Sequence, residues 1–513
     1  MKLGREKLWL FVTLGLWVTI PFFAIQYYPL FPAVVMPLTG IDRFVPLFQP
    51  AVWLYISLYV QLTVPLLLAR EPGELRRMAF GFAWIVLISH TLFLLWPTAI
   101  PSLLSGVRIT DPLLRTVVAV ETSRNACPSL HASLAIYCAL CAARILQARR
   151  HKGLLWAWTS LILAATLLAK QHVFLDILAG GVLGWMAFVA LFRVGPSEAA
   201  ASEALQATLR ARSEVARAIG AQLELVSSQD WRRRAGELAF FAGLCICGVF
   251  LTVSGWKAVG IAATTLALNA FVLLMHEGMH DSLFRSHAVN WFGSVLLGST
   301  FLMSFSAYRV LHTRHHNFLG DSRDPDDYRN YTSRPALRWF LHFVRLTCGS
   351  LLYLALIPVL ALKYGSDRER RRILGEYAFL LLAYSLALRF VPAPVLLIAW
   401  LVPLLIVGNL TSIRGFTQHG ITDASDPYIA SRTILPHPIV EFFVLHENYH
   451  LEHHLFPEVP SYHLPRLHGM VWPRMPRVVS GRGYLQFLLR FFRATSRLDE
   501  TPIGLERPAP KSA

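Results

Sequence analysis

Nine histidines in the second half of the chain have the spacing of metal ligands. Three clusters read His276-Glu-Gly-Met-His280, His312-Thr-Arg-His315-His316 and His450-Leu-Glu-His453-His454, and His419 precedes the third. Imidazole binds borderline first-row metals such as iron without adding charge to the site. Side chains four residues apart share one face of a helix, so His276 and His280 can point at one ion. In each His-x-x-His-His box, we expect the first two histidines to share a face and the third to reach a second ion. The nine donors predict a site for two metal ions.

A second constellation in the first half has residue types that suit phosphoryl transfer. Its two parts read Ser123-Arg124-Asn-Ala-Cys-Pro-Ser129-Leu-His131 and Lys170-Gln-His172-Val-Phe-Leu-Asp176. An imidazole can attack phosphorus, and a carboxylate four residues later can orient it. A second imidazole can protonate the leaving oxygen, while basic and hydroxyl side chains hold the phosphoryl oxygens.

The elements that carry these residues are long apolar runs. The chain has 513 residues, of which 55% are hydrophobic and only 15% charged. Repeated runs of about 18 to 20 apolar residues predict an all-α, polytopic membrane protein. We expect runs at 8–27, 51–69, 78–97, 131–147, 153–170, 175–194, 238–254, 258–275, 289–306, 348–362, 376–391 and 393–410.

The basic residues predict how the chain crosses the membrane. The net charge is +17, but the Lys and Arg residues fall mainly in short loops between apolar runs. This pattern favours membrane topology over nucleic acid binding. Basic groups before the first run and after the second, fourth and sixth runs would all lie in the cytoplasm. His172 then lies on the same side of the membrane as His131, and both face the periplasm or a lumen. The chain returns to the cytoplasm at His276, so we expect the metal site there. For the three boxes to meet, 289–306 and one later run, 348–362, must be interfacial or re-entrant.

The second-half motifs resemble the membrane fatty acid desaturase and hydroxylase superfamily. The resemblance covers roughly 236–470 and includes the three boxes, Gln418-His419-Gly420 and Asn448-Tyr-His-Leu-Glu-His-His-Leu-Phe-Pro457. It implies a non-haem di-iron centre, O2 as co-substrate, a membrane lipid as substrate and a separate ferredoxin- or cytochrome-type electron donor. The carboxylates Asp324 and Asp326 are candidates for orienting the metal-binding rings, as is Glu452. Asn448 is a candidate water-mediated ligand, and we expect His446 to lie outside the first coordination shell.

The first-half motifs resemble the type 2 phosphatidic acid phosphatase superfamily, closest to its inositol phosphotransferase branch. The resemblance covers about 50–195. It implies that His172 is the nucleophile, Asp176 its orienting carboxylate and His131 the general acid. It further implies that the phosphate is bound by Ser129, Lys170 and Arg124. The first motif of the broader family, a Lys followed by Arg-Pro, is missing, and Trp96-Pro-Thr-Ala-Ile-Pro101 stands in its place. This departure leaves both hydrolysis and transfer open.

Together the patterns predict a six-helix phosphatase-like bundle followed by a helical histidine-box desaturase domain. The expected boundaries are 1–195 for the first domain, 196–235 for an amphipathic cytoplasmic linker helix, 236–475 for the desaturase domain and 476–513 for a basic amphipathic tail. The predicted function is a bifunctional lipid enzyme, an acyl-lipid desaturase fused to a lipid phosphatase or phosphotransferase. One alternative is a di-iron lipid hydroxylase or ketolase with a non-catalytic phosphatase-like anchor. Another is a histidine-rich metal transporter.

Overall fold

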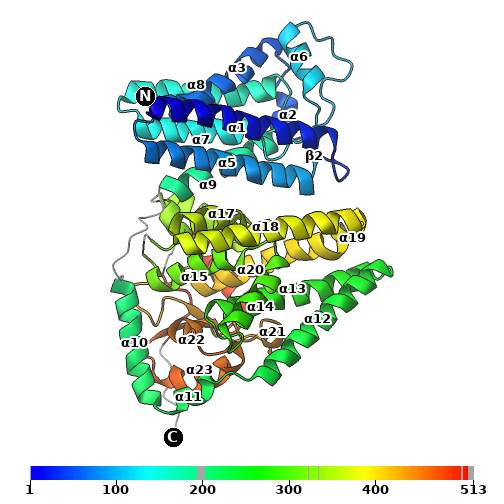
Figure 1. Cartoon of the computed structure of the whole chain (residues 1–513). Helices are drawn as coiled ribbons and strands as arrows, with labels where there is room; N and C mark the ends of the chain where they lie inside the picture. The colour runs from blue at the N-terminus through cyan, green and yellow to red at the C-terminus, as the bar shows by residue number, and fades with distance from the viewer. Residues whose placement is uncertain (1, 193–202, 322, 333, 498–500, 507–513) are drawn as a thin grey trace. The chain divides into compact units, whose positions relative to one another are not determined.

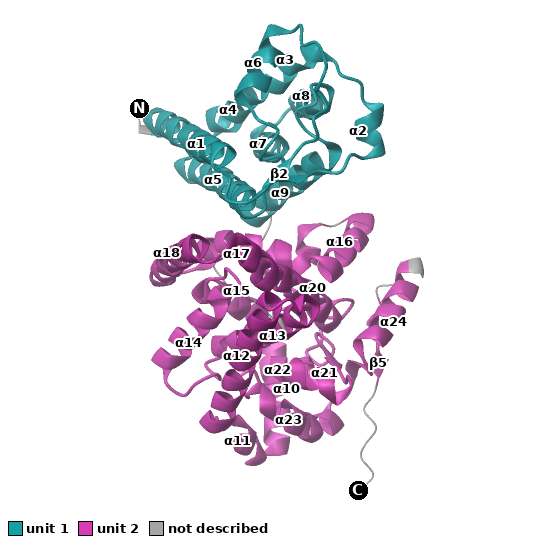
Figure 2. Ribbon diagram, turned by 90° about the vertical axis from the view of Figure 1, so that its right-hand side faces the viewer, with its two compact units in different colours: residues 1–193 teal, residues 194–513 magenta. Residues whose placement is uncertain are grey.

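The chain folds into two compact units, Met1–Arg193 and Val194–Ala513 (Figure 2). The computed structural model describes residues 2–192, 203–321, 323–332, 334–497 and 501–506. Residues 196–202, at the start of the predicted linker, lie outside the described part, as do 498–500 and 507–513 of the predicted tail.

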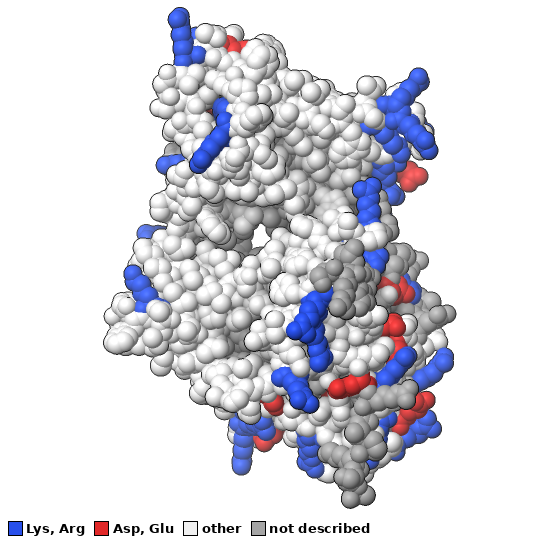
Figure 3. Space-filling view, turned by 180° about the vertical axis from the view of Figure 1, so that it is seen from behind, with Lys and Arg blue, Asp and Glu red and all other residues white. Residues whose placement is uncertain are grey.

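The fold is helical and suited to a membrane, as predicted. Among the described residues, eight helices are long and apolar enough to cross a bilayer, or nine if one bent pair is counted as a span. The protein is therefore an all-α, multi-pass membrane protein. In Figure 3, one flank of the second unit carries almost no charged side chains, whereas Lys, Arg, Asp and Glu gather towards one end of that unit.

The first unit is a helical bundle in which α7 (Leu130–Ile145) packs against α9 (Phe174–Phe192) (Figure 1). Glycines allow the close approach. A Cβ at Gly180 would lie 2.3 Å from the carbonyl oxygen of Ser129, and one at Gly184 would lie 2.2 Å from that of Ser133. Small residues four apart commonly permit such contact between membrane helices. The close approach brings the start of α7 beside the first turn of α9.

The remaining elements of the first unit surround this pair. Helix α7 is apolar but only 16 residues long, so it is shorter than the eight candidate spans and is not counted among them. The flanking elements are α1 (Lys2–Tyr27), β1 (Val34–Val35), α2 (Gly40–Phe44), η1 (Gln49–Ala51), α3 (Val52–Ile56), α4 (Leu58–Leu68), α5 (Pro72–Leu95), β2 (Thr98–Ala99), α6 (Pro112–Val120) and α8 (Arg149–Leu168).

The described part of the second unit begins with two helices that cover its later segments. Helices α10 (Glu203–Ile219) and α11 (Gln222–Ser227) pack against α22 (His450–Leu455) and α23 (Leu464–Val471). The buried face of α10 carries Ala211, Val215 and Ile219, which join an apolar cluster with Leu451 and Leu455.

The body of the second unit is built around α13 (Lys257–Met279) and α20 (Val402–His419), which pack together. Helix α12 (Trp231–Val253) forms a hairpin with α13 (Figure 1). The other elements are α14 (His287–Ser299), α15 (Phe305–Phe318), η2 (Tyr328–Tyr331), α16 (Pro335–Thr347), α17 (Gly349–Tyr364), α18 (Asp367–Phe390), α19 (Ala393–Leu396), the π-helical segment η3 (Leu397–Leu401), α21 (Pro438–Phe443), η4 (Ser461–His463), η5 (Trp472–Arg474) and α24 (Tyr484–Arg497). Strands β3 (Arg432–Ile434), β4 (Val478–Gly481) and β5 (Leu505–Glu506) form a small sheet in that order.

Two apolar runs of the second unit are not single membrane helices. The run 289–306 contains α14, which is 13 residues long and ends at Ser299, before α15 starts at Phe305. The run 348–362 belongs to α17, which is bent by 96° relative to α16. A 13-residue helix spans only about 20 Å, too short for a bilayer core.

Candidate metal centre and phosphoryl-transfer site

Four segments of the second unit bring all nine histidines together. His276 lies in the last turn of α13 and His280 directly after it, and α15 carries the second box. His419 ends α20, and α22 carries the third box. Buried hydrogen bonds fix α15 to α18, because Ser304 and Ser306 donate to Glu376 through hydroxyl groups 2.6 Å and 2.5 Å from its carboxylate oxygens.

The imidazoles form two adjoining groups. The ligand atoms of His276, His280, His312 and His453 lie within 4.8 Å of one another, and those of His315, His419 and His454 form a second such group. His316 joins the first group, since its Nε2 lies 3.1 Å from that of His312. His450 joins the second, with its Nε2 2.8 Å from His419 and 3.2 Å from His454.

The division of each His-x-x-His-His box differs from the expectation. In each box the first and third histidines lie in the same group and the middle one lies in the other group. His312 and His316 belong to the first group and His315 to the second. His450 and His454 belong to the second group and His453 to the first. The reason is helical geometry. At about 100° per residue, positions i and i+4 differ by about 40° around the axis, whereas i and i+3 differ by about 60° in the opposite sense.

The spacing of the nitrogen atoms fits metal coordination. The Nε2 atoms of His280 and His312 are 2.9 Å apart, and His312 also faces His316. Two ligands at about 2.1 Å from one ion and at right angles would be roughly 3 Å apart. A single ring N–H on His312 cannot serve both neighbours. The Nε2 of His453 is buried without a hydrogen-bond partner among the described residues. The residues therefore fit two metal ions.

Burial keeps most of these rings neutral. It lowers the pKa of His280, His312 and His316 well below the usual histidine range, and neighbouring imidazoles lower it further. The pKa of His453 falls to about 3, again chiefly through burial. Neutral rings present the lone pairs that a metal needs.

Two buried carboxylates orient the rings from behind. Asp324 Oδ2 lies 2.9 Å from His315 Nδ1. Burial alone would lower the pKa of His315, but Asp324 raises it to about 8. Glu447 Oε1 lies 3.2 Å from His276 Nδ1. Burial would raise the pKa of Glu447, yet His276, His453 and Arg414 bring it down to about 2. Such partners fix which nitrogen faces the metal.

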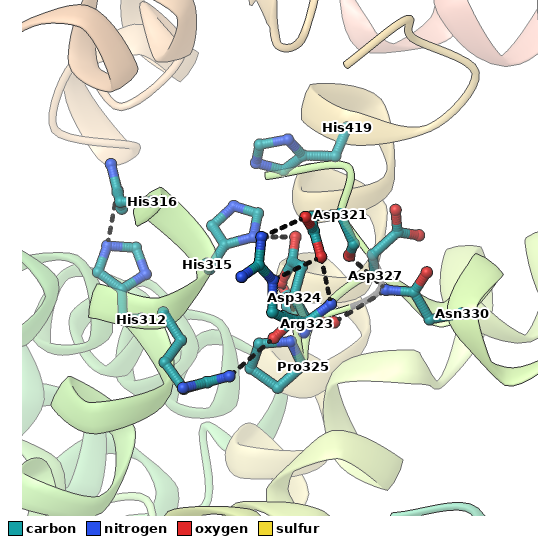
Figure 4. A network of polar contacts seen from close by, with 12 residues as sticks. His312, His315, His316, Asp321, Arg323, Asp324, Pro325, Asp327, Asn330 and His419 are labelled. Atoms are coloured by element: carbon teal, nitrogen blue, oxygen red, sulfur yellow. Dashed lines mark hydrogen bonds and ion pairs between the residues drawn. The ribbon is translucent and has the colours of Figure 1, made fainter. Parts of the chain in front are cut away.

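Figure 4 shows the acidic loop beside the second box, with Asp321, Asp324 and Asp327 gathered near His315 and with His419 on the other side of that ring. The loop is held by its own contacts: Asn330 Nδ2 donates to the backbone carbonyls of Asp321 and Asp324 at 2.9 Å and 3.1 Å. The carboxylate of Asp324 is thereby supported in place.

The other polar candidates have different partners. Asp326 accepts from Arg345 at 3.3 Å, and the described structure records no bond from it to a histidine. Asn448 donates to the carbonyl of Ile434 at 2.9 Å, and its Oδ1 is buried without a partner among the described residues. Glu452 pairs with His468, and His446 pairs with Glu441 at 2.9 Å. Sequence reasoning missed Glu447, although its position three residues before His450 was a usable signal.

The first unit brings together His131, His172, Asp176 and Ser129. His172 Nδ1 lies 3.2 Å from Asp176 Oδ2, and its Nε2 lies 3.4 Å from His131 Nδ1 and 3.3 Å from Ser129 Oγ. Ser129 also accepts from the backbone N–H of Ala132 at the start of α7. Burial lowers the pKa of His172, but the neighbouring Asp176 outweighs this, so the net pKa is raised. The pair has the geometry of a carboxylate-oriented imidazole.

Two members of this site escaped the sequence analysis. Tyr55 stacks on His131 with ring centroids 4.2 Å apart, and its hydroxyl donates to Glu121 Oε2 at 2.8 Å. Burial raises the pKa of the Glu121 carboxyl. No motif marked either residue, because they come from separate segments of chain.

The two predicted basic phosphate ligands, Lys170 and Arg124, have no recorded contact with the two histidines of this site in the described part of the chain. The ammonium of Lys170 donates to the carbonyls of Asp42 and Val45, at 3.2 Å and 2.5 Å. Arg124 is exposed, in a segment bridged to Ala99. Within the described residues, neither side chain is recorded bonding to His131 or His172.

The geometry defines a helical membrane protein with a paired histidine centre in one unit and a His-His-Asp site in the other. Comparison with known families agrees: residues 254–487 match the fatty acid desaturase family, and residues 37–190 match the PAP2 superfamily. The chain thus combines a PAP2-superfamily segment with a fatty acid desaturase segment, which confirms the predicted fusion.

A curated relative is also similar. A β-carotene ketolase from Paracoccus sp. (strain PC1) is 26% identical over 239 residues, which is 46% of this chain and 83% of the relative. The two families and this relative together support a lipid-modifying membrane enzyme with an oxidoreductase unit.

Proposed function

We propose that the second unit uses two iron ions and O2 to oxidise an unactivated C–H bond of a membrane lipid. The observation that carries this proposal is the convergence of nine imidazoles in two groups with ligand-like spacing. Bound iron would supply the oxidising power. His276, His280, His312, His316 and His453 would hold one ion, and His315, His419, His450 and His454 the other. Glu447 and Asp324 would keep two of these rings oriented.

We favour desaturation as the outcome. It would remove two hydrogen atoms from adjacent lipid carbons and convert O2, two electrons and two protons into two water molecules. The electrons require a donor, which we propose to be a separate protein of ferredoxin or cytochrome type. The family match supports desaturation. The similarity to a ketolase favours the second candidate, insertion of oxygen at a methylene.

Lipid mass spectrometry of a host that expresses the chain separates these outcomes. Desaturation gives products that lack two hydrogens, whereas hydroxylation or ketolation gives products that gain oxygen. Either product must disappear in His315→Ala and persist in His172→Ala. If neither product depends on His315, the proposed oxidation is wrong.

A metal transporter is the third possibility, and metal exchange tests it. The contacts of Glu447 with His276 and of Asp324 with His315 hold these rings in place, which favours permanent binding over transit. If iron crosses the membrane of vesicles that contain the purified chain, the result would support transport and contradict our proposal.

We further propose that the first unit transfers or hydrolyses a phosphate ester. His172 Nε2 would attack phosphorus, and the departing alcohol would take a proton from His131. Water or a lipid hydroxyl would then attack the phosphohistidine and return a proton to His131. The distances around His172 and its bond to Asp176 support these roles. Phosphate release or phosphoryl transfer from phosphatidic acid must be lost in His172→Ala and retained in His315→Ala. Unchanged rates in His172→Ala would make the first unit a non-catalytic anchor.

For sidedness, we propose a cytoplasmic iron site and a phosphoryl-transfer site that faces the periplasm or a lumen. The distribution of basic loops supports this arrangement. Single cysteines at Arg150 and Arg108 in a cysteine-free chain provide the test. An impermeant thiol reagent should label only position 108 from outside, and the reverse pattern would overturn the orientation.

A further inference from the structure

A cavity in the second unit adjoins the histidine groups. It is lined by residues of α13, α15, α16, α17 and α20, and it reaches His276, His312, His315, His419 and His450. Its volume is about 140 Å³, and a cavity of about 150 Å³ can hold a benzene-sized ring. If the proposed lipid oxidation is correct, this space receives the part of the substrate that reacts.

The lining changes character along α20. Leu404, Val407 and Gly408 give one end an apolar wall, and Thr411, Arg414 and Gln418 follow on the same face, ahead of His419. Helix α17 contributes the apolar side chains of Leu351, Leu354 and Ile357 together with the hydroxyl groups of Ser350 and Tyr353. A binding site for a plain hydrocarbon chain would not need hydrogen-bonding groups close to the histidine groups.

Two arginines line the cavity, and their partners differ. Arg345 is compensated, because its guanidinium contacts both carboxylate oxygens of Asp326 at 3.3 Å. Arg414 donates to the amide oxygen of Asn269 at 3.2 Å. Arg414 and Glu447 interact electrostatically, but no ion pair between them is recorded among the described residues. A guanidinium has five N–H donors, and a single hydrogen bond from the guanidinium of Arg414 is recorded among the described residues, so the side chain can still donate to a ligand in the cavity.

An unpartnered hydroxyl group lies one turn away from Arg414. Thr411 Oγ1 is buried and has no hydrogen-bond partner among the described residues, and its side chain lines the same cavity. Thr411 and Arg414 are three residues apart on α20 and therefore neighbours on one face. Arg414 precedes His419 by five residues, or about 7.5 Å along the helix axis.

We propose that Thr411 and Arg414 form a binding subsite for an oxygen atom of the substrate. The substrate class is a lipid that carries a carbonyl or hydroxyl oxygen within a few bonds of the carbon to be oxidised. Arg414 donates to this oxygen, Thr411 adds a second hydrogen bond, and the apolar end of the cavity receives the adjoining hydrocarbon. The subsite determines which lipid carbon is placed beside the histidine groups.

Two small probes of nearly equal shape test this subsite. Cyclohexanone and methylenecyclohexane differ in having a carbonyl oxygen or a methylene group at the same position. Their binding to the full chain in lipid nanodiscs is measured by saturation-transfer NMR, with and without iron. The wild type should prefer the ketone by roughly tenfold or more, as expected of a hydrogen bond to a charged donor. Arg414→Met should abolish most of this preference and Thr411→Val should reduce it.

Arg389→Met is the matched control, because it removes an exposed arginine from α18 and should leave the preference unchanged. Equal binding of both probes by the wild type would overturn the proposal. A ketone preference that survives in Arg414→Met would also overturn the proposal. If the iron content of that variant falls at the same time, the role of Arg414 is to support Glu447 and not to bind the substrate oxygen. The measurement without iron keeps the test of the subsite independent of the proposed oxidation. If the chain binds no iron, the proposed oxidation is wrong, but the preference for the ketone can still be measured.

Discussion

At the scale of single residues, the carboxylates behind the imidazoles determine whether the histidine groups can hold metal. Glu447 is 2% exposed and lies close to two rings, with Oε1 3.2 Å from His276 Nδ1 and Oε2 3.9 Å from His450 Nδ1. These rings belong to different groups, so one carboxylate touches both halves of the proposed centre.

Replacing Glu447 by Gln should weaken metal retention. The amide keeps the size of the side chain but removes the charge that orients the rings, and the loss of such partners commonly costs 10- to 100-fold in affinity, as an order-of-magnitude estimate. Iron content after dialysis against a graded series of chelator concentrations measures the effect. Glu452→Gln is the control, since that buried carboxylate pairs with His468 and Thr433 instead. Equal losses in both variants would show that Glu447 has no special role.

Asp176 should set the pH dependence of phosphoryl transfer. His172 attacks only when its Nε2 is unprotonated, and the raised pKa of the ring means that activity falls as the pH drops through that value. Asp176→Asn removes the main cause of the upward shift, so the acidic limb of the rate profile should move to lower pH while the maximal rate falls. The pH dependence of phosphate release from phosphatidic acid measures this. A limb that stays in place, or moves to higher pH, would contradict the assignment.

At the scale of elements, close helix contacts place the reacting groups. The approach of α7 to α9 depends on Gly180, because the carbonyl of Ser129 occupies the space that a Cβ would need. Gly180→Ala should force the helices apart, destabilise the first unit by about 1–3 kcal/mol and move Ser129 and His131 away from His172.

Gly181→Ala provides the matched control, since the nearest atom to its Cβ would be Ile136 Cγ1 at 4.0 Å. Thermal unfolding in detergent and phosphate release should be close to those of the wild type in this variant and reduced in Gly180→Ala. Equal behaviour of the two variants would mean that the helix contact does not position the site.

A buried ion pair fixes the first histidine box to its neighbours. Arg234 on α12 pairs with Glu277, which also accepts from Ser461 Oγ at 2.6 Å. Both charged side chains are almost fully buried. Arg234→Met would leave Glu277 uncompensated, so we expect a loss of about 3–5 kcal/mol in unfolding free energy.

Arg233→Met should cost about 0–1 kcal/mol, because the side chain of Arg233 is 47% exposed and its pair with Glu237 is a surface contact. Denaturant titration in detergent compares the two variants. A similar stability for both would show that the Arg234–Glu277 pair does not hold the box in place.

At the scale of the whole molecule, hydropathy and motif spacing predicted the helical membrane fold and the fusion of two families. Apolar length alone did not show that the chain breaks between Ser299 and Phe305 or bends between α16 and α17. Those features depend on the helices that pack around them. The pairing of His312 with His316, rather than His315, is a matter of angular register on the helix.

Long-range partners were equally hidden in the sequence. Tyr55 and Glu121 meet across 66 residues and Glu447 meets His276 across 171. Both contacts are products of tertiary packing, which local spacing does not encode. The contact of Asp324 with His315 could be predicted from the sequence, because Asp324 lies only nine residues after His315, in the loop that follows α15.

The most direct test of the account is the metal content of the purified full chain. We predict two iron ions per chain, with the magnetic coupling in Mössbauer spectra that two adjacent ions require. His315→Ala and His312→Ala, which alter different groups, should each reduce this content. A single uncoupled ion, or a chain that folds normally and binds no iron after reconstitution, would contradict the central claim.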